Sequence, residues 1–95
     1  MAARNTTLTL TAGTWLQLTD NDVTSITFQN KSGVDIWVAG TTSASAPANR
    51  LSAVRYGPGQ GERNAFLSDL FPGITAVRVY AIADSNGEVY VSHGA

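Results

Sequence analysis

The chain has 95 residues, with six basic and seven acidic side chains and a net charge of −1 at neutral pH. A chain of this length builds one hydrophobic core, so we expect a single domain over residues 1–95, and the absence of cysteine excludes disulfides and thiolate chemistry. The even balance of charges argues against nucleic acid or a membrane surface as a partner, because both attract a concentrated basic face.

Polar and apolar side chains alternate through the first third of the chain, and this period of two is typical of β-strands. In the first strand Leu8 and Leu10 share one face, and threonines occupy the other. The first two strands are close enough to form a hairpin, and we expect a flexible N-terminal arm over residues 1–7. The predicted strands cover residues 6–11, 14–18 and 23–29.

The middle of the chain continues this alternation and then loses it. A strand over residues 34–38 alternates cleanly, and we expect it to form a second hairpin with the strand over residues 23–29. Residues 40–49 are small and polar without a period, which predicts a long surface loop. A further strand over residues 51–56 is followed by a glycine-rich turn over residues 57–61.

The last third of the chain predicts one short helix and a closing hairpin. Residues 65–71 carry apolar side chains at helical spacing and allow one or two helical turns. Strands over residues 74–83 and 88–93 flank an Asn86-Gly87 pair, which suits a type I′ turn. The whole pattern predicts an all-β domain, a small antiparallel β-sandwich or barrel of about six to eight strands with one short helical turn.

The sequence offers no set of residues typical of a catalytic site. Its one histidine, His93, has no acidic or hydroxyl partner that the sequence can place beside it, so we expect an exposed side chain at the end of a strand. Turn chemistry explains the acidic clusters at residues 20–22 and 84–88, because neither completes a calcium-binding loop. We therefore predict that the protein is not an enzyme and holds no metal or other cofactor. No apolar run approaches the roughly 20 residues that span a membrane.

The two tryptophans lie out of phase with the apolar residues beside them. Trp37 falls on the opposite face of its strand from Ile36 and Val38, and Trp15 precedes Leu16 in the same way. Both side chains are therefore expected to project from the core face. Two interpretations stay open, because outward tryptophans can cover the end or second layer of a sandwich or can anchor an interface.

Four segments of the chain stand in a distinctive order. Residues 26–40 read ITFQNKSGVDIWVAG, a loop of small residues follows, and residues 58–61 read PGQG. Residues 79–82 then read VYAI, and residues 87–91 read GEVYV after a turn. In this order of elements, over about 70 residues, the chain resembles small accessory virion proteins of tailed bacteriophages.

This resemblance implies a non-enzymatic structural protein of the virion. It implies a cement or decoration protein on the capsid exterior, whose partner is the major capsid protein. We also expect a homo-oligomer, with a trimer as the simplest arrangement at a three-fold position of the lattice. The N-terminal arm and the loop over residues 40–49 are expected to make the contacts. The residues expected at this interface are Arg4, Asn5, Thr6, Trp15, Trp37, Arg50, Tyr56 and Phe71.

An alternative function belongs to another class. A tail-associated or spike-associated module that binds carbohydrate or a receptor would use Trp15, Trp37 or Tyr56 as a stacking platform, because aromatic faces bind sugars well. A metal-dependent enzyme on a small barrel would instead need several histidines, and the chain has one.

Overall fold

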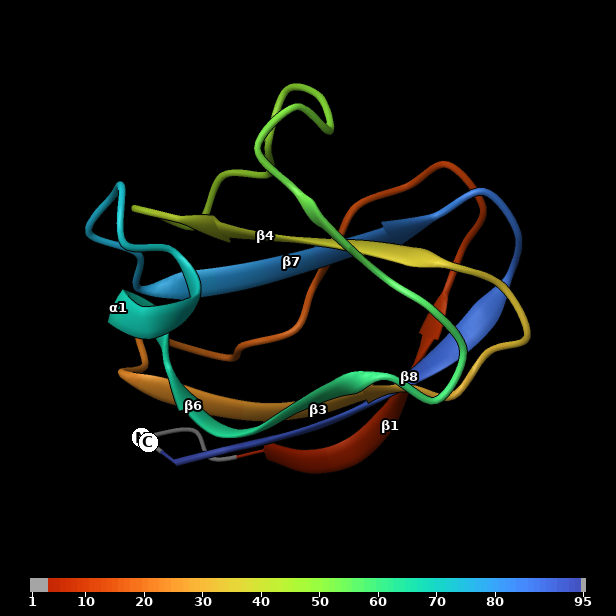
Figure 1. Ribbon diagram of the computed structural model, residues 1–95, viewed down its shortest axis with the longest axis horizontal. Coiled ribbons are helices and arrows are strands. Elements are labelled where there is room, and N and C mark those ends of the chain that lie inside the picture. Colours follow the sequence, from red (N-terminus) through yellow and green to blue (C-terminus); the bar gives the residue numbers. More distant parts are fainter. Residues whose placement is uncertain (1–3, 95) are drawn as a thin grey trace.

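The computed structural model describes residues 4–94, and within this range the chain forms eight strands and one helical turn (Figure 1). Sheet A contains β1, β8, β3 and β6 in this order, and sheet B contains β2, β7, β4 and β5. The two antiparallel sheets pack face to face, so the predicted all-β sandwich with one short helical turn is confirmed. The elements are β1 (Arg4–Leu10), β2 (Leu16–Gln17), β3 (Ser25–Asn30), β4 (Ile36–Thr41), β5 (Val54–Tyr56), β6 (Gly61–Phe66), α1 (Leu67–Leu70), β7 (Arg78–Ala83) and β8 (Gly87–His93).

The strands follow the order of a jelly roll. The first strand pairs with the last, β2 with β7, β3 with β6 and β4 with β5, and every pair is antiparallel. Further pairing of β8 with β3 and of β7 with β4 completes the sheets. Two Greek keys in this arrangement define a jelly roll. Among the described strands, β4 and β5 alone are both consecutive in the chain and neighbours in a sheet.

The three predicted hairpins are wrong, although strands form close to the seven predicted positions, and β6 forms where no strand is predicted. β1 and β2, β3 and β4, and β7 and β8 lie in opposite sheets, so each of these connections crosses the sandwich. Asn86 and Gly87 do not have the positive φ of a type I′ turn, and the Asn86 side chain instead accepts a hydrogen bond from Ala12 N at 2.8 Å. β3 begins at Ser25 rather than at residue 23, and β5 begins at Val54 rather than at residue 51.

The core lies between the two sheets and is built from the alternate residues that the sequence pattern indicates. Sheet A buries Phe28, and its ring meets Tyr56 of sheet B edge-on, with 5.0 Å between the ring centroids. Leu67 of α1 is also buried, so the helical turn closes one end of the sandwich. The other large, fully buried apolar side chains are Leu10, Leu18, Ile26, Ile36, Val38, Val79, Val89 and Val91.

A buried asparagine fixes the connection between β3 and β4. Asn30 is fully buried, and its Nδ2 donates to the carbonyl oxygens of Val34 at 2.7 Å and of Tyr56 at 3.1 Å. Its Oδ1 accepts hydrogen bonds from the main-chain N and the hydroxyl of Ser32. Every polar atom of the amide therefore has a partner, which offsets the cost of removing it from water.

Polar side chains close both open sides of the sandwich. On one side the Tyr56 hydroxyl of β5 donates to Oε2 of Glu62 in β6 at 3.1 Å. On the other side Arg4 of β1 forms an ion pair with Asp20 and donates to the carbonyl oxygen of Leu18 at 3.0 Å. The flexible arm predicted over residues 1–7 is corrected in part, because residues 4–7 belong to β1, and the rest of the arm lies outside the described residues.

Candidate functional site

The outer face of sheet B carries a tryptophan that is held by an arginine. Trp37 points away from the core, as predicted, and lies opposite Ile82 of β7 and Arg55 of β5. The guanidinium of Arg50 lies over the Trp37 ring at 4.6 Å from its centroid, and Arg50 Nη2 lies 2.8 Å from Oδ1 of Asp84. A cation–π contact and an ion pair therefore tie the base of the loop over residues 42–53 to the outer face of sheet B.

This loop folds into a defined shape and presents a leucine to solvent. The Thr41 hydroxyl donates to Ser43 O at 2.6 Å, and Asn49 Oδ1 accepts from Leu51 N at 2.9 Å in an Asx turn. A further hydrogen bond from Ala53 N to Arg50 O closes the turn. Leu51 at its tip is 92% exposed, so a large apolar side chain stands free on a loop that is anchored next to it.

An apolar groove of about 250 Å³ opens beside the same loop, at the end of the molecule where α1 lies. Val54 and Ile74 are each 46% exposed in its wall. Phe71 packs directly on Gly40, where a Cβ atom would come within 2.5 Å of the ring. Ser52, the neighbour of Leu51, also lines it, and we call this groove together with Leu51 the loop-end surface. The groove is lined by Gly40, Ser52, Val54, Leu70, Phe71, Gly73 and Ile74.

A second, more polar groove of about 380 Å³ lies on sheet A. β3, β6 and β8 supply its polar side chains, and the Tyr90 hydroxyl at its wall donates to Oδ1 of Asn5 at 2.8 Å. Opposite β3 the register of β6 shifts, and Asn64 adopts φ 47°. The lining residues are Thr27, Phe28, Gln29, Gly59, Gly61, Glu62, Arg63 and Tyr90.

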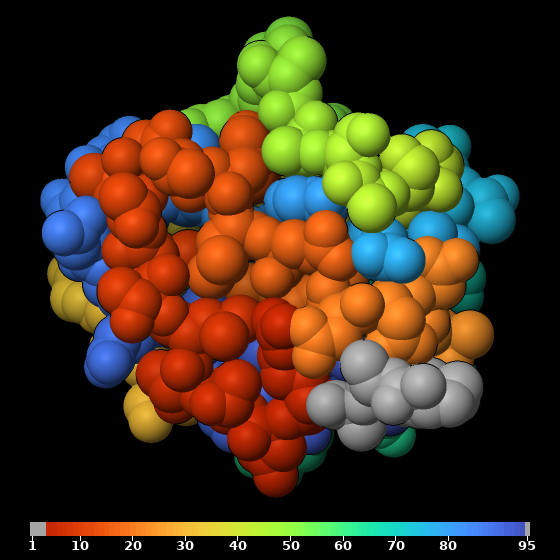
Figure 2. Space-filling view, turned by 180° about the vertical axis from the view of Figure 1, so that it is seen from behind, coloured from red at the N-terminus to blue at the C-terminus, as the bar shows by residue number. Residues whose placement is uncertain are grey.

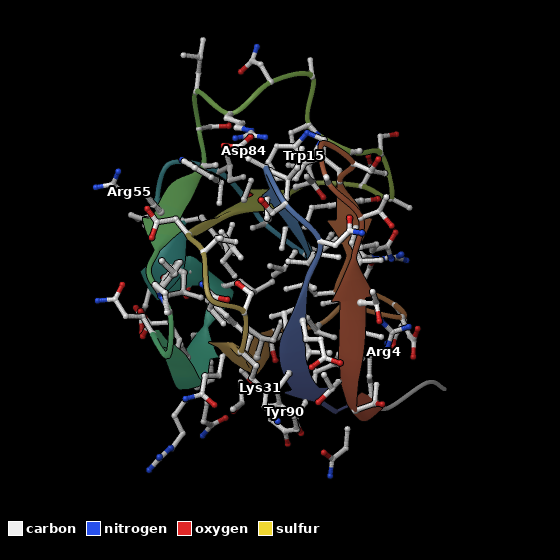
Figure 3. All side chains as sticks on the ribbon, turned by 90° about the vertical axis from the view of Figure 1, so that its right-hand side faces the viewer. Arg4, Trp15, Lys31, Arg55, Asp84 and Tyr90 are labelled. Atoms are coloured by element: carbon white, nitrogen blue, oxygen red, sulfur yellow. The ribbon has the colours of Figure 1, made fainter. Side chains whose placement is uncertain are left out.

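The structure brings three of the eight expected interface residues to one region. Trp37 and Arg50 are in contact, and Arg50 also pairs with Asp84. The segment that carries Trp15 is held close to Asp84, because Gly13 N donates a hydrogen bond to Ala83 O. Figure 3 shows Trp15 and Asp84 together at the upper end, on the side of sheet B.

The other five expected residues lie elsewhere. Arg4, Asn5 and Thr6 are on β1 in sheet A, and Figure 3 shows Arg4 in the lower half of the molecule. Tyr56 is half-buried at the junction of β5 and β6, and Phe71 is half-buried in the groove of the loop-end surface. Burial together with the neighbouring Glu62 carboxylate raises the pKa of Tyr56 to about 12.

His93 is buried, which corrects the exposed strand end that the sequence predicts. Its Nε2 accepts a hydrogen bond from Asp20 N at 3.1 Å, and Nδ1 lies 2.6 Å from Gly94 O. These contacts assign the ring the tautomer with hydrogen on Nδ1. The carboxylates of Asp20 and Asp22 pair with Arg4 and Arg78. Within residues 4–94 there is no cluster of three or more acidic, histidine or cysteine side chains that could hold a metal ion.

Sequence reasoning missed the exposed apolar residues and the partner of Arg50. The predicted strands over residues 51–56 and 74–83 include Leu51 and Ile74, but β5 begins at Val54 and β7 begins at Arg78. Val54 lies in a strand, as predicted, yet its side chain is 46% exposed. The place of Leu51 close to the end of a loop of small, polar residues is the one sequence signal for its exposure. The approach of Asp84 to Arg50 depends on the crossing of the β7–β8 connection between the sheets, so the sequence held no local signal for it.

Comparison with protein-family models, curated protein sequences and solved structures finds no match. No helix in the described part of the chain has the length and apolar character needed to cross a membrane.

Proposed function

We propose that this protein is a non-enzymatic structural protein of a tailed-phage virion that decorates the capsid exterior and binds the major capsid protein. The resemblance of residues 26–40 and of the later segments to accessory virion proteins supports this proposal. The jelly roll adds support at the level of analogy, because viral capsid proteins use it, as lectins do. The site-level support is the loop-end surface, where Leu51, Val54 and Ile74 stay exposed beside a groove.

The anchored loop makes this surface suitable for docking. Exposed apolar side chains rimmed by polar residues are typical of interaction sites. Complete burial of a fully exposed side chain contributes about 1.5 to 3 kcal/mol, and Val54 and Ile74, which are 46% exposed, contribute less than Leu51. The contacts of Arg50 with Trp37 and Asp84 restrict the loop before binding, which lowers the entropy lost on docking. A capsid lattice repeats the partner surface many times, so modest single contacts give strong retention when the protein is also oligomeric.

Co-sedimentation with capsids tests the proposal. Full-length protein is mixed with phage heads that lack it, and the bound fraction is measured after pelleting. We expect saturable binding by the wild type and a loss of affinity of at least about tenfold for the double variant Leu51→Ser and Ile74→Ser. The matched control is Val34→Ser, which removes an apolar side chain that is 36% exposed at the opposite end of β4. Wild-type protein that stays in the supernatant would contradict the proposal.

A carbohydrate-binding or receptor-binding module of a tail or spike is the second candidate, and the polar groove on sheet A favours it. Thr27, Gln29 and Arg63 offer hydroxyl, amide and guanidinium groups beside the Tyr90 ring, a combination that suits a saccharide. This groove differs from the platform that the sequence suggests, because Arg50 covers Trp37 and Tyr56 is half-buried against Phe28. A glycan array probed with wild type and Tyr90→Ala tests it, and binding that needs Tyr90 would favour this function over decoration.

A further inference from the structure

The free edge of β1 differs from the other three sheet edges. The edge strands are β1 and β6 in sheet A and β2 and β5 in sheet B. β2 has two residues, β5 has three, and β6 combines a register shift with a positive φ at Asn64. Short length and bulges protect edges from pairing with another chain. β1 has seven residues in unbroken register with β8 and contains no proline, so neither device protects it.

The register shows which main-chain groups of β1 face outward. Lys31 N donates to Glu88 O at 3.0 Å. The main-chain N–H and C=O groups of Glu88, and of every second residue after it in β8, therefore point toward β3. The main-chain groups of Val89, and of every second residue from it in β8, point the other way and form hydrogen bonds with β1, where Leu8 is the partner of Val89. It follows that the N–H and C=O groups of the intervening β1 residues point away from sheet A. These residues are Asn5, Thr7 and Thr9, and the structure gives their main-chain groups no partner within residues 4–94.

We propose that this edge binds a second copy of the chain through antiparallel pairing of β1 with β1. Thr7 then lies opposite Thr7 of the second copy, and Asn5 lies opposite Thr9 of the second copy, so every outward group finds a partner. The pairing joins two four-stranded A sheets into one continuous sheet. Self-complementary pairing is two-fold, so it makes a dimer in place of the trimer expected from the sequence.

The side chains of β1 are compatible with a copy of themselves. Arg4 is the one charged residue of the strand, and its ion pair with Asp20 neutralises it, so like charges do not oppose the pairing. Threonine favours strands and packs well across them. Leu8 is only partly buried at the core side of this edge, and a second copy would cover it further. Figure 2 shows β1 in red on the open surface of the molecule, below the orange atoms that follow it.

Light scattering on the full-length chain is the first test. We expect a mass about twice 10.0 kDa at high concentration, falling on dilution. Thr7→Pro removes an outward N–H, and proline is tolerated on the free side of an edge strand, so this variant should give the mass of one chain. Thr7→Val keeps the N–H and is the matched control, which should still dimerise. A wild type that stays at the mass of one chain up to millimolar concentration overturns the proposal.

Amide hydrogen exchange on the wild type gives an answer that does not depend on a variant that folds. The amides of Asn5, Thr7 and Thr9 should become protected as concentration rises, while the core amides of β8 stay protected throughout. A dimer in which these three amides exchange rapidly would place the contact elsewhere and would refute pairing through β1. The inference does not rest on capsid binding, because both measurements use the purified chain alone.

Discussion

The guanidinium carbon of Arg50 lies 4.6 Å from the centroid of the Trp37 ring. Replacing Arg50 by alanine removes this contact and the ion pair with Asp84. Each is worth at most about 1 kcal/mol at a partly exposed site, so we expect the free energy of unfolding to fall by about 1 kcal/mol. The loop over residues 42–53 should open about fivefold more often, because it loses its anchor while the sheets remain intact. Hydrogen exchange of the loop amides measures this opening.

Arg55→Ala is the matched control for the loop. Arg55 also projects from the outer face of sheet B, opposite Trp37, but its side chain is 67% exposed. Its ion pair with Asp35 is long, with 3.7 Å between Arg55 Nε and Asp35 Oδ2. Its removal should leave exchange in residues 42–53 unchanged. Equal effects of the two variants would show that the loop is held by something other than the contact with Trp37.

The sequence predicts the faces of the strands well and their partners poorly. Alternation places Leu10, Phe28 and Val91 inside, and all three are buried. The same alternation arises whether a turn joins two strands of one sheet or carries the chain to the other sheet, because only the buried face sets the period. Connections that cross between the two sheets of a jelly roll therefore have the same pattern as hairpins, although in the jelly roll distant strands such as β1 and β8 pair.

The interface residues show the same division between local and tertiary information. The outward direction of Trp37 follows from its place between Ile36 and Val38, and in the structure these two neighbours are buried while Trp37 lies on the outer face. The cation–π contact of Arg50 with that ring depends on the path of the loop over sheet B, and no local sequence pattern specifies this path. Asn30 stands between the predicted strands over residues 23–29 and 34–38, where a fully buried amide and an exposed turn residue look alike in one sequence.

Asn30 should be one of the most sensitive positions of the chain. Alanine at this site would remove the hydrogen bonds that the Asn30 side chain makes with the carbonyl oxygen of Tyr56 and with the main-chain N of Ser32. Unsatisfied buried groups cost about 1 to 3 kcal/mol, so we expect the free energy of unfolding to fall by about 3 kcal/mol in urea titrations. Gln29→Ala, at the exposed neighbouring position, should cost less than about 1 kcal/mol. Comparable losses for both variants would refute the role of the buried amide.

The Tyr56 hydroxyl should make stability sensitive to alkaline pH. Burial and the Glu62 carboxylate raise its pKa from 10.0 to about 12, so the folded chain holds this proton more tightly than the unfolded chain. The resulting stabilisation is complete below pH 10 and is lost as the pH rises through the folded pKa. Between these values the free energy of unfolding should therefore decrease, and urea midpoints measured across this range check it.

Tyr56→Phe isolates this group, because phenylalanine keeps the ring against Phe28 but has no proton to lose. The variant gives up the hydrogen bond to Glu62 and should be less stable near neutral pH, yet its stability should decrease less between pH 10 and 12. Tyr90→Phe removes a hydroxyl that donates to Asn5 and not to Glu62, so it serves as the control for the loss of a tyrosine hydroxyl. If Tyr56→Phe and the wild type lose stability in parallel over this range, the Tyr56–Glu62 contact is not the source of the alkaline sensitivity.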